Sequence, residues 1–268
     1  PLTEAVAHCA RLGFKNVELT LDPGTPADPR TFSKAARHAL RTQLKSEGLT
    51  VSALMRNLRL IEGTMTSAQN VEALKEAAEL AHDLSPDAPP PIETVLGGKP
   101  DRWEVSKATM AGALAEWTKA VESLQVDLLL KAHVFMAVDT PDKLLWLLNQ
   151  NPSGRVHVAY DYSHFQPQGL TMEATWAALA SRTRFIHVKD TRKEGDKLLM
   201  VLPGEGGVDY TAFFRMLRRT GYAGPVVAEV SAMVFRQPGY DPLATAEKCY
   251  RVLADALKAS AEPPKTSG

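Results

Sequence analysis

Hydrophobic and polar residues follow two periods along the chain, one typical of helices and one typical of short buried strands. Near the start, apolar residues recur at helical spacing between Leu2 and Leu12, and Gly13 follows where such a helix would end. A short apolar run then predicts a strand, and the same alternation continues to residue 257. The predicted strands are 14–19, 49–54, 92–96, 126–134, 156–161, 184–190 and 225–230, and the predicted helices are 2–12, 32–47, 68–84, 103–124, 141–150, 171–180, 210–220 and 242–257.

Strict alternation of helices with strands rich in Val, Ile and Leu predicts one α/β domain built on a parallel sheet. The length of 268 residues suits a (β/α)8 barrel, which takes roughly 250 residues. We count seven strands, and the chain begins on a helix, so the first strand is expected to be missing from this chain. A seven-stranded open barrel and a doubly wound sheet are the alternatives. We expect one domain over residues 1–258 and a flexible tail over residues 259–268.

Composition narrows the class of protein. Hydrophobic residues make up 44% and charged residues 23% of the chain, as in ordinary soluble globular proteins. The 31 Lys and Arg residues balance the 31 Asp and Glu residues, which argues against binding nucleic acid by phosphate neutralisation. No apolar run approaches the roughly 18 residues of a membrane span. With two cysteines and no visible signal peptide, we expect a cytoplasmic protein, although an exported protein with a removed leader stays open.

Ionisable residues end each of the last four predicted strands. On each strand they share one face, because strand side chains alternate between faces. A single carboxylate at a strand end is as often a helix cap as a functional group, but four coincidences of face and position are harder to dismiss. If that face points into a barrel, one mouth collects Lys131, His133, Asp161, His187, Lys189 and Glu229. Glu18, on the first predicted strand, is expected either to reach the mouth or to pair with a lysine.

The order of motifs in the chain resembles that of one family. The motifs are residues 12–19, Asp161-Tyr162-Ser163-His164, Phe185-Ile186-His187-Val188-Lys189-Asp190, Gly204-Glu205-Gly206 with Asp209, Gly221-Tyr222-x-Gly224, and Glu229. They resemble the xylose isomerase-like TIM barrels, which include sugar phosphate isomerases and epimerases, dehydratases and the AP endonuclease 2-type enzymes. The resemblance covers nearly the whole chain and is specific for the superfamily, not for a substrate. The endonuclease branch fits poorly because the chain has no basic excess.

The resemblance implies a divalent metal held by Glu, Asp, His and Glu from the last four strands. Asp161, His187 and Glu229 match three of these ligands, whereas Lys131 stands where the first Glu is expected. If a metal is bound, we expect Mn, Co, Zn or Mg, with His133 as a candidate fourth ligand. Alternatively, the Lys131 ammonium replaces the metal. Three carboxylates and a dication sum to −1, and so do Lys131, Asp161 and Glu229 without metal.

The resemblance implies chemistry that begins by removing a proton next to a carbonyl group. Glu229 is the expected proton acceptor, and Lys131 is expected either to exchange protons or to stabilise the oxyanion. Candidate substrate contacts are His133, His164, Lys189 and Arg192. The first hypothesis is a metal-assisted isomerase or epimerase of a small carbohydrate. The alternatives are a keto-sugar lyase or hydratase, with or without metal, and a catalytically degenerate barrel that binds a ligand. A homo-oligomer is also possible, because apolar helices on the outside of such barrels often pair.

Overall fold

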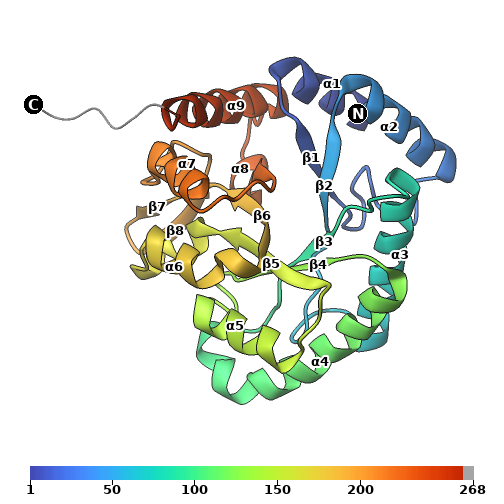
Figure 1. Cartoon of the computed structure of the whole chain (residues 1–268), viewed down its shortest axis with the longest axis vertical. Coiled ribbons are helices and arrows are strands. Elements are labelled where there is room, and N and C mark those ends of the chain that lie inside the picture. The colour runs from blue at the N-terminus through green and yellow to red at the C-terminus, as the bar shows by residue number, and fades with distance from the viewer. Residues whose placement is uncertain (262–268) are drawn as a thin grey trace, which may run out of the picture.

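The computed structural model describes residues 1–261 and places a parallel sheet inside a ring of helices (Figure 1). The seven strands of this sheet lie in the order β1-β2-β3-β4-β5-β6-β9, and every neighbouring pair is parallel. The seven strand predictions are therefore confirmed, with ends displaced by up to three residues. Their bounds are β1 Asn16–Thr20, β2 Thr50–Met55, β3 Ile92–Thr94, β4 Leu128–Lys131, β5 Val156–Asp161, β6 Thr183–Val188 and β9 Val226–Ala228.

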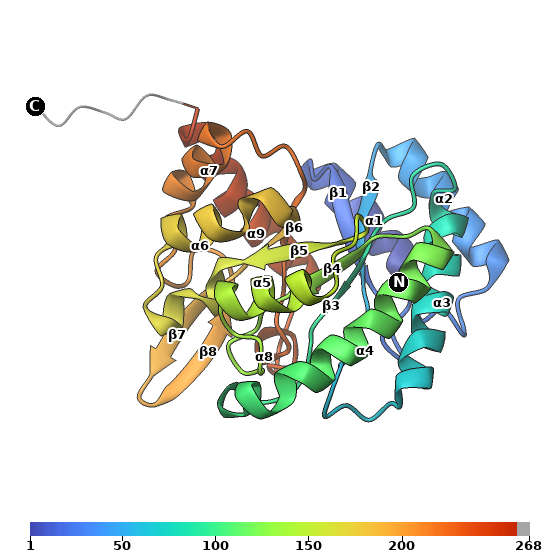
Figure 2. The same cartoon turned by 60° about the horizontal axis from the view of Figure 1, so that its bottom comes forward.

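Helices follow the strands and cover the outer face of the sheet (Figures 1 and 2). Their ends are set by local caps: Thr66 and Gln69 form a capping box at the start of α3, and Gly13 ends α1 with a φ of 103°. The α-helices are α1 Leu2–Leu12, α2 Lys34–Glu47, α3 Ser67–Leu84, α4 Trp103–Leu124, α5 Pro141–Gln150, α6 Met172–Leu179, α7 Tyr210–Arg219, α8 Ala232–Phe235 and α9 Pro242–Ala259. Short 3-10 turns are η1 Pro100–Arg102, η2 Tyr162–His164, η3 Gln166–Gln168 and η4 Ala180–Arg182.

A small apolar layer fills the interior of the sheet and is separate from the large core between sheet and helices. It contains Ala53, Leu129, Ala159 and Phe185, with Val227 packed against them. Four of these residues lie on the same strand faces as the ionisable residues of the sequence: Leu129, Ala159, Phe185 and Val227. Those faces therefore point inward, and this layer forms the floor beneath the ionisable side chains.

The sheet is open between its two edge strands, β1 and β9. No backbone pairing joins them in the described part of the chain, which contains no eighth strand of this sheet. A cleft with a volume of about 1410 Å³ runs along the two edges. Its walls come from α1, β1, β9 and α9, and its inner end reaches the ionisable side chains of Glu18, Lys131 and Glu229.

Residues 192–197 carry charges of both signs, as a solvated loop does, but they form strand and turn. They lie in an antiparallel hairpin of β7 Asp190–Glu194 and β8 Lys197–Val201, which projects from the barrel in Figure 2. Most side chains of β7 are exposed and carry charges of both signs, so its sequence does not show the apolar alternation of a buried strand. The apolar half of β8 packs near α8, and this contact stabilises the pair.

At the carboxyl end of the chain, α9 extends to Ala259, one residue beyond the expected end of the domain. The expected flexible tail lies mostly outside the described residues. None of the helices in residues 1–261 is long and apolar enough to cross a membrane.

Candidate active site

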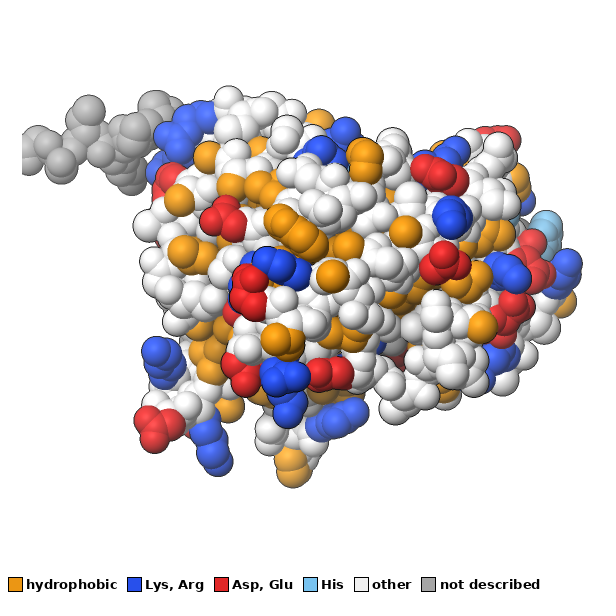
Figure 3. Space-filling model, turned by 90° about the horizontal axis from the view of Figure 1, so that it is seen from below, with side chains coloured by type: hydrophobic (Ala, Val, Ile, Leu, Met, Phe, Trp, Pro, Cys, Tyr) orange, Lys and Arg blue, Asp and Glu red, His pale blue; other side chains and the backbone are white. Residues whose placement is uncertain are grey.

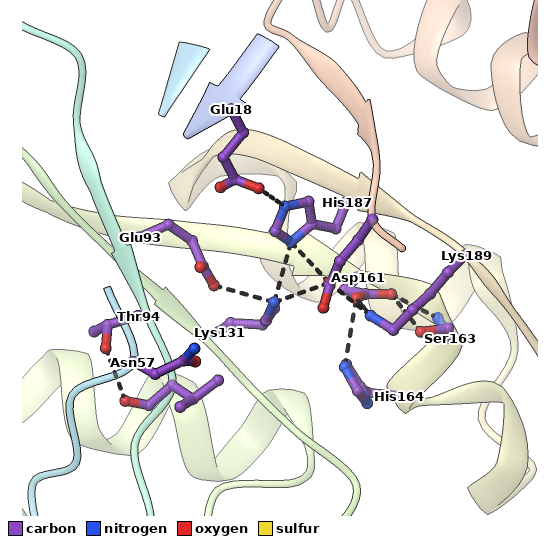
Figure 4. Close-up of polar contacts among 12 residues, drawn as sticks. Glu18, Asn57, Glu93, Thr94, Lys131, Asp161, Ser163, His164, His187 and Lys189 are labelled. Atoms are coloured by element: carbon purple, nitrogen blue, oxygen red, sulfur yellow. Dashed lines mark hydrogen bonds and ion pairs between the residues drawn. The ribbon is translucent and has the colours of Figure 1, made fainter. Parts of the chain in front are cut away.

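Six strands, or the residues that directly follow them, bring ionisable side chains to one end of the sheet. This is the end at which the carboxyl termini of parallel strands meet, and where the active sites of such barrels lie. Figure 4 shows these side chains pointing toward one another. The group, called the ionic cluster below, consists of Glu18, Glu93, Lys131, Asp161, His187, Lys189 and Glu229. Of these, Glu229 has the most accessible side chain, with 20% exposed, whereas Glu93 and Asp161 are fully buried.

Lys131 lies at the centre of the ionic cluster. Its Nζ is 3.2 Å from Glu93 Oε1, 3.0 Å from Glu229 Oε2 and 3.1 Å from His187 Nδ1. Burial acts to lower the pKa of this lysine, but the carboxylates of Glu229 and Glu93 overcome that effect and raise it. Lys131 is therefore an ammonium ion at neutral pH. It can stabilise negative charge but is a poor proton acceptor.

Glu229 binds a second ammonium ion. Lys189 Nζ donates to Asp161 Oδ2 and, at 2.8 Å, to Glu229 Oε2. Burial acts to raise the pKa of Glu229, but Lys131 and Lys189 hold it well below its usual range. Every hydrogen bond and ion pair that the Glu229 carboxylate makes with the described residues uses Oε2. Since Glu229 also lines the cleft, Oε1 is the oxygen left to meet a substrate.

His187 lies between two carboxylates. Its Nε2 donates to Glu18 Oε2 at 2.7 Å, and its Nδ1 is 3.1 Å from Glu229 Oε2. Burial acts to lower the pKa of His187, but the facing Glu18 carboxylate outweighs burial and raises it. Glu18 thus reaches the mouth and pairs with a histidine rather than a lysine.

His133 and His164 stack on each other beside the ionic cluster, with ring centroids 4.0 Å apart. Burial and the Lys189 charge lower the pKa of both imidazoles, that of His133 to about 3. Neither ring nitrogen of His164 makes a hydrogen bond to the described residues, although Nε2 lies 3.4 Å from Asp161 Oδ2. Both rings are therefore neutral at pH 7 and suit hydrogen bonds to substrate hydroxyls.

Arg192 is not brought to the ionic cluster. It lies on β7 with half of its side chain exposed, and its Nη2 pairs with Glu194 Oε1 at 2.8 Å. The remaining candidates converge, but their roles as ligands or substrate contacts stay predictions.

Sequence reasoning missed Glu93. The predicted strand 92–96 carries a polar residue on each face, Glu93 on one and Thr94 on the other, so alternation did not identify an inward face. The available signal was a single carboxylate next to the apolar Ile92, four positions before Gly97-Gly98.

Asp161, His187 and Glu229 form a possible metal site, because their ligand atoms lie within 4.8 Å of one another. Two ammonium groups, however, contact the carboxylate oxygens that a metal would use. An ammonium about 4 Å from a dication repels it by roughly 8 kcal/mol at an effective dielectric constant of about 20. The donor set suits a metal, but with Lys131 and Lys189 in these positions the site as a whole does not fit one.

Comparisons with known proteins identify the same fold. A family model described as "Xylose isomerase-like TIM barrel" matches residues 6–252. An inosose dehydratase from Geobacillus kaustophilus is 21% identical over 255 residues, which cover 84% of this chain and 79% of that protein. One from Clostridium beijerinckii is 23% identical over 168 residues. That match covers 57% of this chain and 55% of the relative, about half of its length.

Solved structures share the fold at low identity. The probable 3-DHS dehydratase of Bacillus anthracis has a TM-score of 0.75 and 15% identity, with 95% of this chain and 93% of that chain covered. The 3-keto-D-glucoside 4-epimerase of E. coli has a TM-score of 0.72 and 14% identity, with 95% and 94% covered. The neighbours thus include both dehydratases and epimerases, which act on sugars and related compounds.

Proposed function

We propose that this chain, which belongs to the xylose isomerase-like TIM barrel family, is a lyase that removes water from an uncharged polyhydroxy ketone. The observation that carries the proposal is the position of the Lys131 ammonium, between Glu93 and Glu229 at the carboxyl end of β4. The resemblance places a carboxylate here. An ammonium at this position leaves Glu229 as the most accessible carboxylate of the ionic cluster. A single base suffices for elimination but not for a two-base epimerisation.

In the proposed reaction, Glu229 Oε1 takes the proton next to the substrate carbonyl. Lys131 stabilises the negative charge that develops on the carbonyl oxygen, while Lys189 keeps Glu229 Oε2 in place. The Glu229 carboxyl group then returns the proton to the hydroxyl on the next carbon. That hydroxyl leaves as water, and a carbon–carbon double bond forms. His133 and His164 bind neighbouring hydroxyls as neutral imidazoles.

Charge in the site favours an uncharged substrate. Four carboxylates of the ionic cluster face two lysine ammonium groups, and both ammonium groups are paired with these carboxylates. Arg56, near the mouth, is paired with Asp22 at 3.1 Å. A phosphate or carboxylate at the ionic cluster would therefore have to compete with these groups for the two lysine ammonium groups.

The proposed partner is a small carbohydrate and not a nucleic acid. Lys and Arg residues equal Asp and Glu residues in number, and the two signs are interspersed on the face seen in Figure 3. Association by counterion release would need a basic surface.

An epimerase is the second candidate, and the likeness to the E. coli epimerase favours it. In that reading a divalent metal, Mn, Co, Zn or Mg, is bound by Asp161, His187 and Glu229. Both lysines would first have to leave the carboxylates. The two candidates differ in product, because elimination releases water and epimerisation returns a ketone of the same mass.

The test is incubation of the purified protein with inosose and with D-fructose in ordinary water, followed by NMR and mass spectrometry. We expect an unsaturated product 18 mass units lighter from inosose. Glu229→Gln should lower turnover by at least about 10³-fold. Asp127→Asn, which breaks an exposed pair with Arg155, is the control and should leave turnover unchanged. Formation of an isomeric ketone would favour the epimerase, and ligand binding without turnover would indicate a degenerate barrel.

A further inference from the structure

Glu93 is a buried carboxyl group that the proposed reaction does not yet use. Its side chain has no accessible surface, and neither oxygen makes a hydrogen bond to the described residues. Its single ion pair in that part of the chain is with Lys131, at 3.2 Å. A carboxyl group in such a place is costly unless it is paired. The pair with Lys131 is therefore the feature that explains why an acidic residue occupies this position.

Glu93 does not line the cleft and cannot touch a substrate. It lies on β3, next to β4, and is in register with Leu129, which belongs to the apolar floor. Any effect of Glu93 on the reaction must therefore act through Lys131.

The other carboxylate that holds Lys131 changes its charge during the reaction. When Glu229 accepts the substrate proton, its carboxyl group becomes neutral and its attraction for Lys131 falls. The substrate oxyanion forms in the same step, and the Lys131 ammonium must stay beside it to stabilise its charge. Glu93 keeps its position throughout, because it is shielded from the substrate.

We propose that Glu93 is a positioning residue, which holds the Lys131 ammonium at the reaction centre while Glu229 carries the proton. This inference rests on the proposed function. It gives the two acidic partners of Lys131 different tasks: Glu229 reacts, and Glu93 keeps the cation in place.

The test is a double-mutant cycle with Glu93→Gln, Lys131→Met and the double variant, assayed on inosose. We expect Glu93→Gln to lower kcat by roughly 10- to 100-fold with KM changed less than about threefold, since the stabilisation arises in the transition state. In the Lys131→Met background, the same substitution should change kcat less than about twofold. Equal losses in both backgrounds would contradict a role through Lys131.

Glu93→Asp distinguishes a lost positioning role from a general loss of folding. It keeps the charge but shortens the side chain by one methylene. We expect kcat to fall at least about fivefold, while the midpoint of thermal unfolding stays within about 3 °C of the wild-type value. Unchanged kcat in this variant would contradict the proposal. Asp127→Asn again serves as the control, since its pair lies at the opposite end of β4.

Thermal unfolding separates this inference from the proposed function. If the wild-type protein does not turn over inosose, the proposed substrate fails, but the coupling of Glu93 to Lys131 is still measured. Glu93→Gln and Lys131→Met should each lower the unfolding midpoint by roughly 5–10 °C, and the double variant should lower it less than the sum of these two shifts. Additive shifts would overturn the inference.

Discussion

At position 131 an ammonium ion contacts two carboxylates and an imidazole, all within 3.2 Å. This arrangement favours one of the two roles that the sequence left open for the lysine. With its pKa raised by Glu229 and Glu93, the side chain holds its proton at neutral pH. We therefore assign it the stabilisation of an oxyanion in the proposed reaction and not the transfer of a proton.

His133 makes stability depend on pH. Burial and nearby lysines lower its pKa to about 3 in the folded protein, against about 6.5 in the unfolded chain. The unfolded state thus binds more protons between these values. The contribution of neutral His133 to the free energy of unfolding is complete above about pH 6.5. It is lost as the pH falls toward 3.

The corresponding experiment measures the free energy of unfolding by urea between pH 7 and pH 4. On acidification, the free energy of unfolding of His133→Asn should fall less steeply than that of the wild type. We expect the two slopes to differ by up to roughly 1 kcal/mol per pH unit. His38→Asn, at an exposed position on α2, is the matched control and should leave the slope unchanged. A His133→Asn slope equal to that of the wild type would refute the assignment.

Residue identities near the site were predictable where a strand was long enough to show alternation. Asp161 and His187 stand at or near the ends of six-residue strands, and their faces could be read from the sequence. The predicted strand 92–96 has Glu93 on one face and Thr94 on the other, so the inward orientation of Glu93 could not be read in this way. The distances that make Lys131 a shared partner depend on neighbouring strands, which sequence spacing does not fix.

Among the elements, the loop before α7 is fixed to the end of β6 by Asp190. Its Oδ2 accepts hydrogen bonds from the backbone N–H groups of Gly204 and Gly206, at 3.0 and 2.8 Å, and its Oδ1 accepts one from Tyr210 Oη at 2.9 Å. A Cβ at Gly206 would lie 2.5 Å from the Thr191 carbonyl oxygen. The glycine motif noticed in the sequence is thus explained by close backbone approach.

Asp190→Ala should lower the free energy of unfolding by roughly 3 kcal/mol, because it leaves buried donors without acceptors. Tyr210→Phe removes one of the three hydrogen bonds and should cost about 1 kcal/mol. Chemical denaturation of both variants checks the order. If Asp190→Ala costs no more than Tyr210→Phe, the two backbone hydrogen bonds do not hold the loop.

The hairpin of β7 and β8 shows where element prediction fails. Alternation identifies a strand only when one face is buried, and most β7 side chains are exposed. The seven strands of the parallel sheet were predictable because they are apolar runs covered by helices. The hairpin was not, since its pairing depends on a turn at Gly195 and on packing near α8.

The molecule as a whole combines an open sheet with a site that is rich in charge. The order of strands and helices was predictable from the sequence, because each parallel strand must be followed by a covering helix. The cleft between β1 and β9 was not, since it arises from which edges remain unpaired. The molecule has the barrel of its family and a possible metal group of Asp161, His187 and Glu229. We infer that lysine charge takes the place of a metal there.

Metal content of wild-type protein and of Lys131→Glu tests this account most directly. Both proteins are loaded with Mn, Co or Zn, dialysed, and measured by elemental mass spectrometry, with Asp161→Ala added to Lys131→Glu as the site control. We predict no bound metal in the wild type. In Lys131→Glu we predict about one ion per chain, lost again in the control, because the substitution removes one ammonium and adds a carboxylate that offsets the remaining charge of Lys189. About one ion per chain in the wild type, bound through Asp161, would contradict the claim that Lys131 and Lys189 take its place.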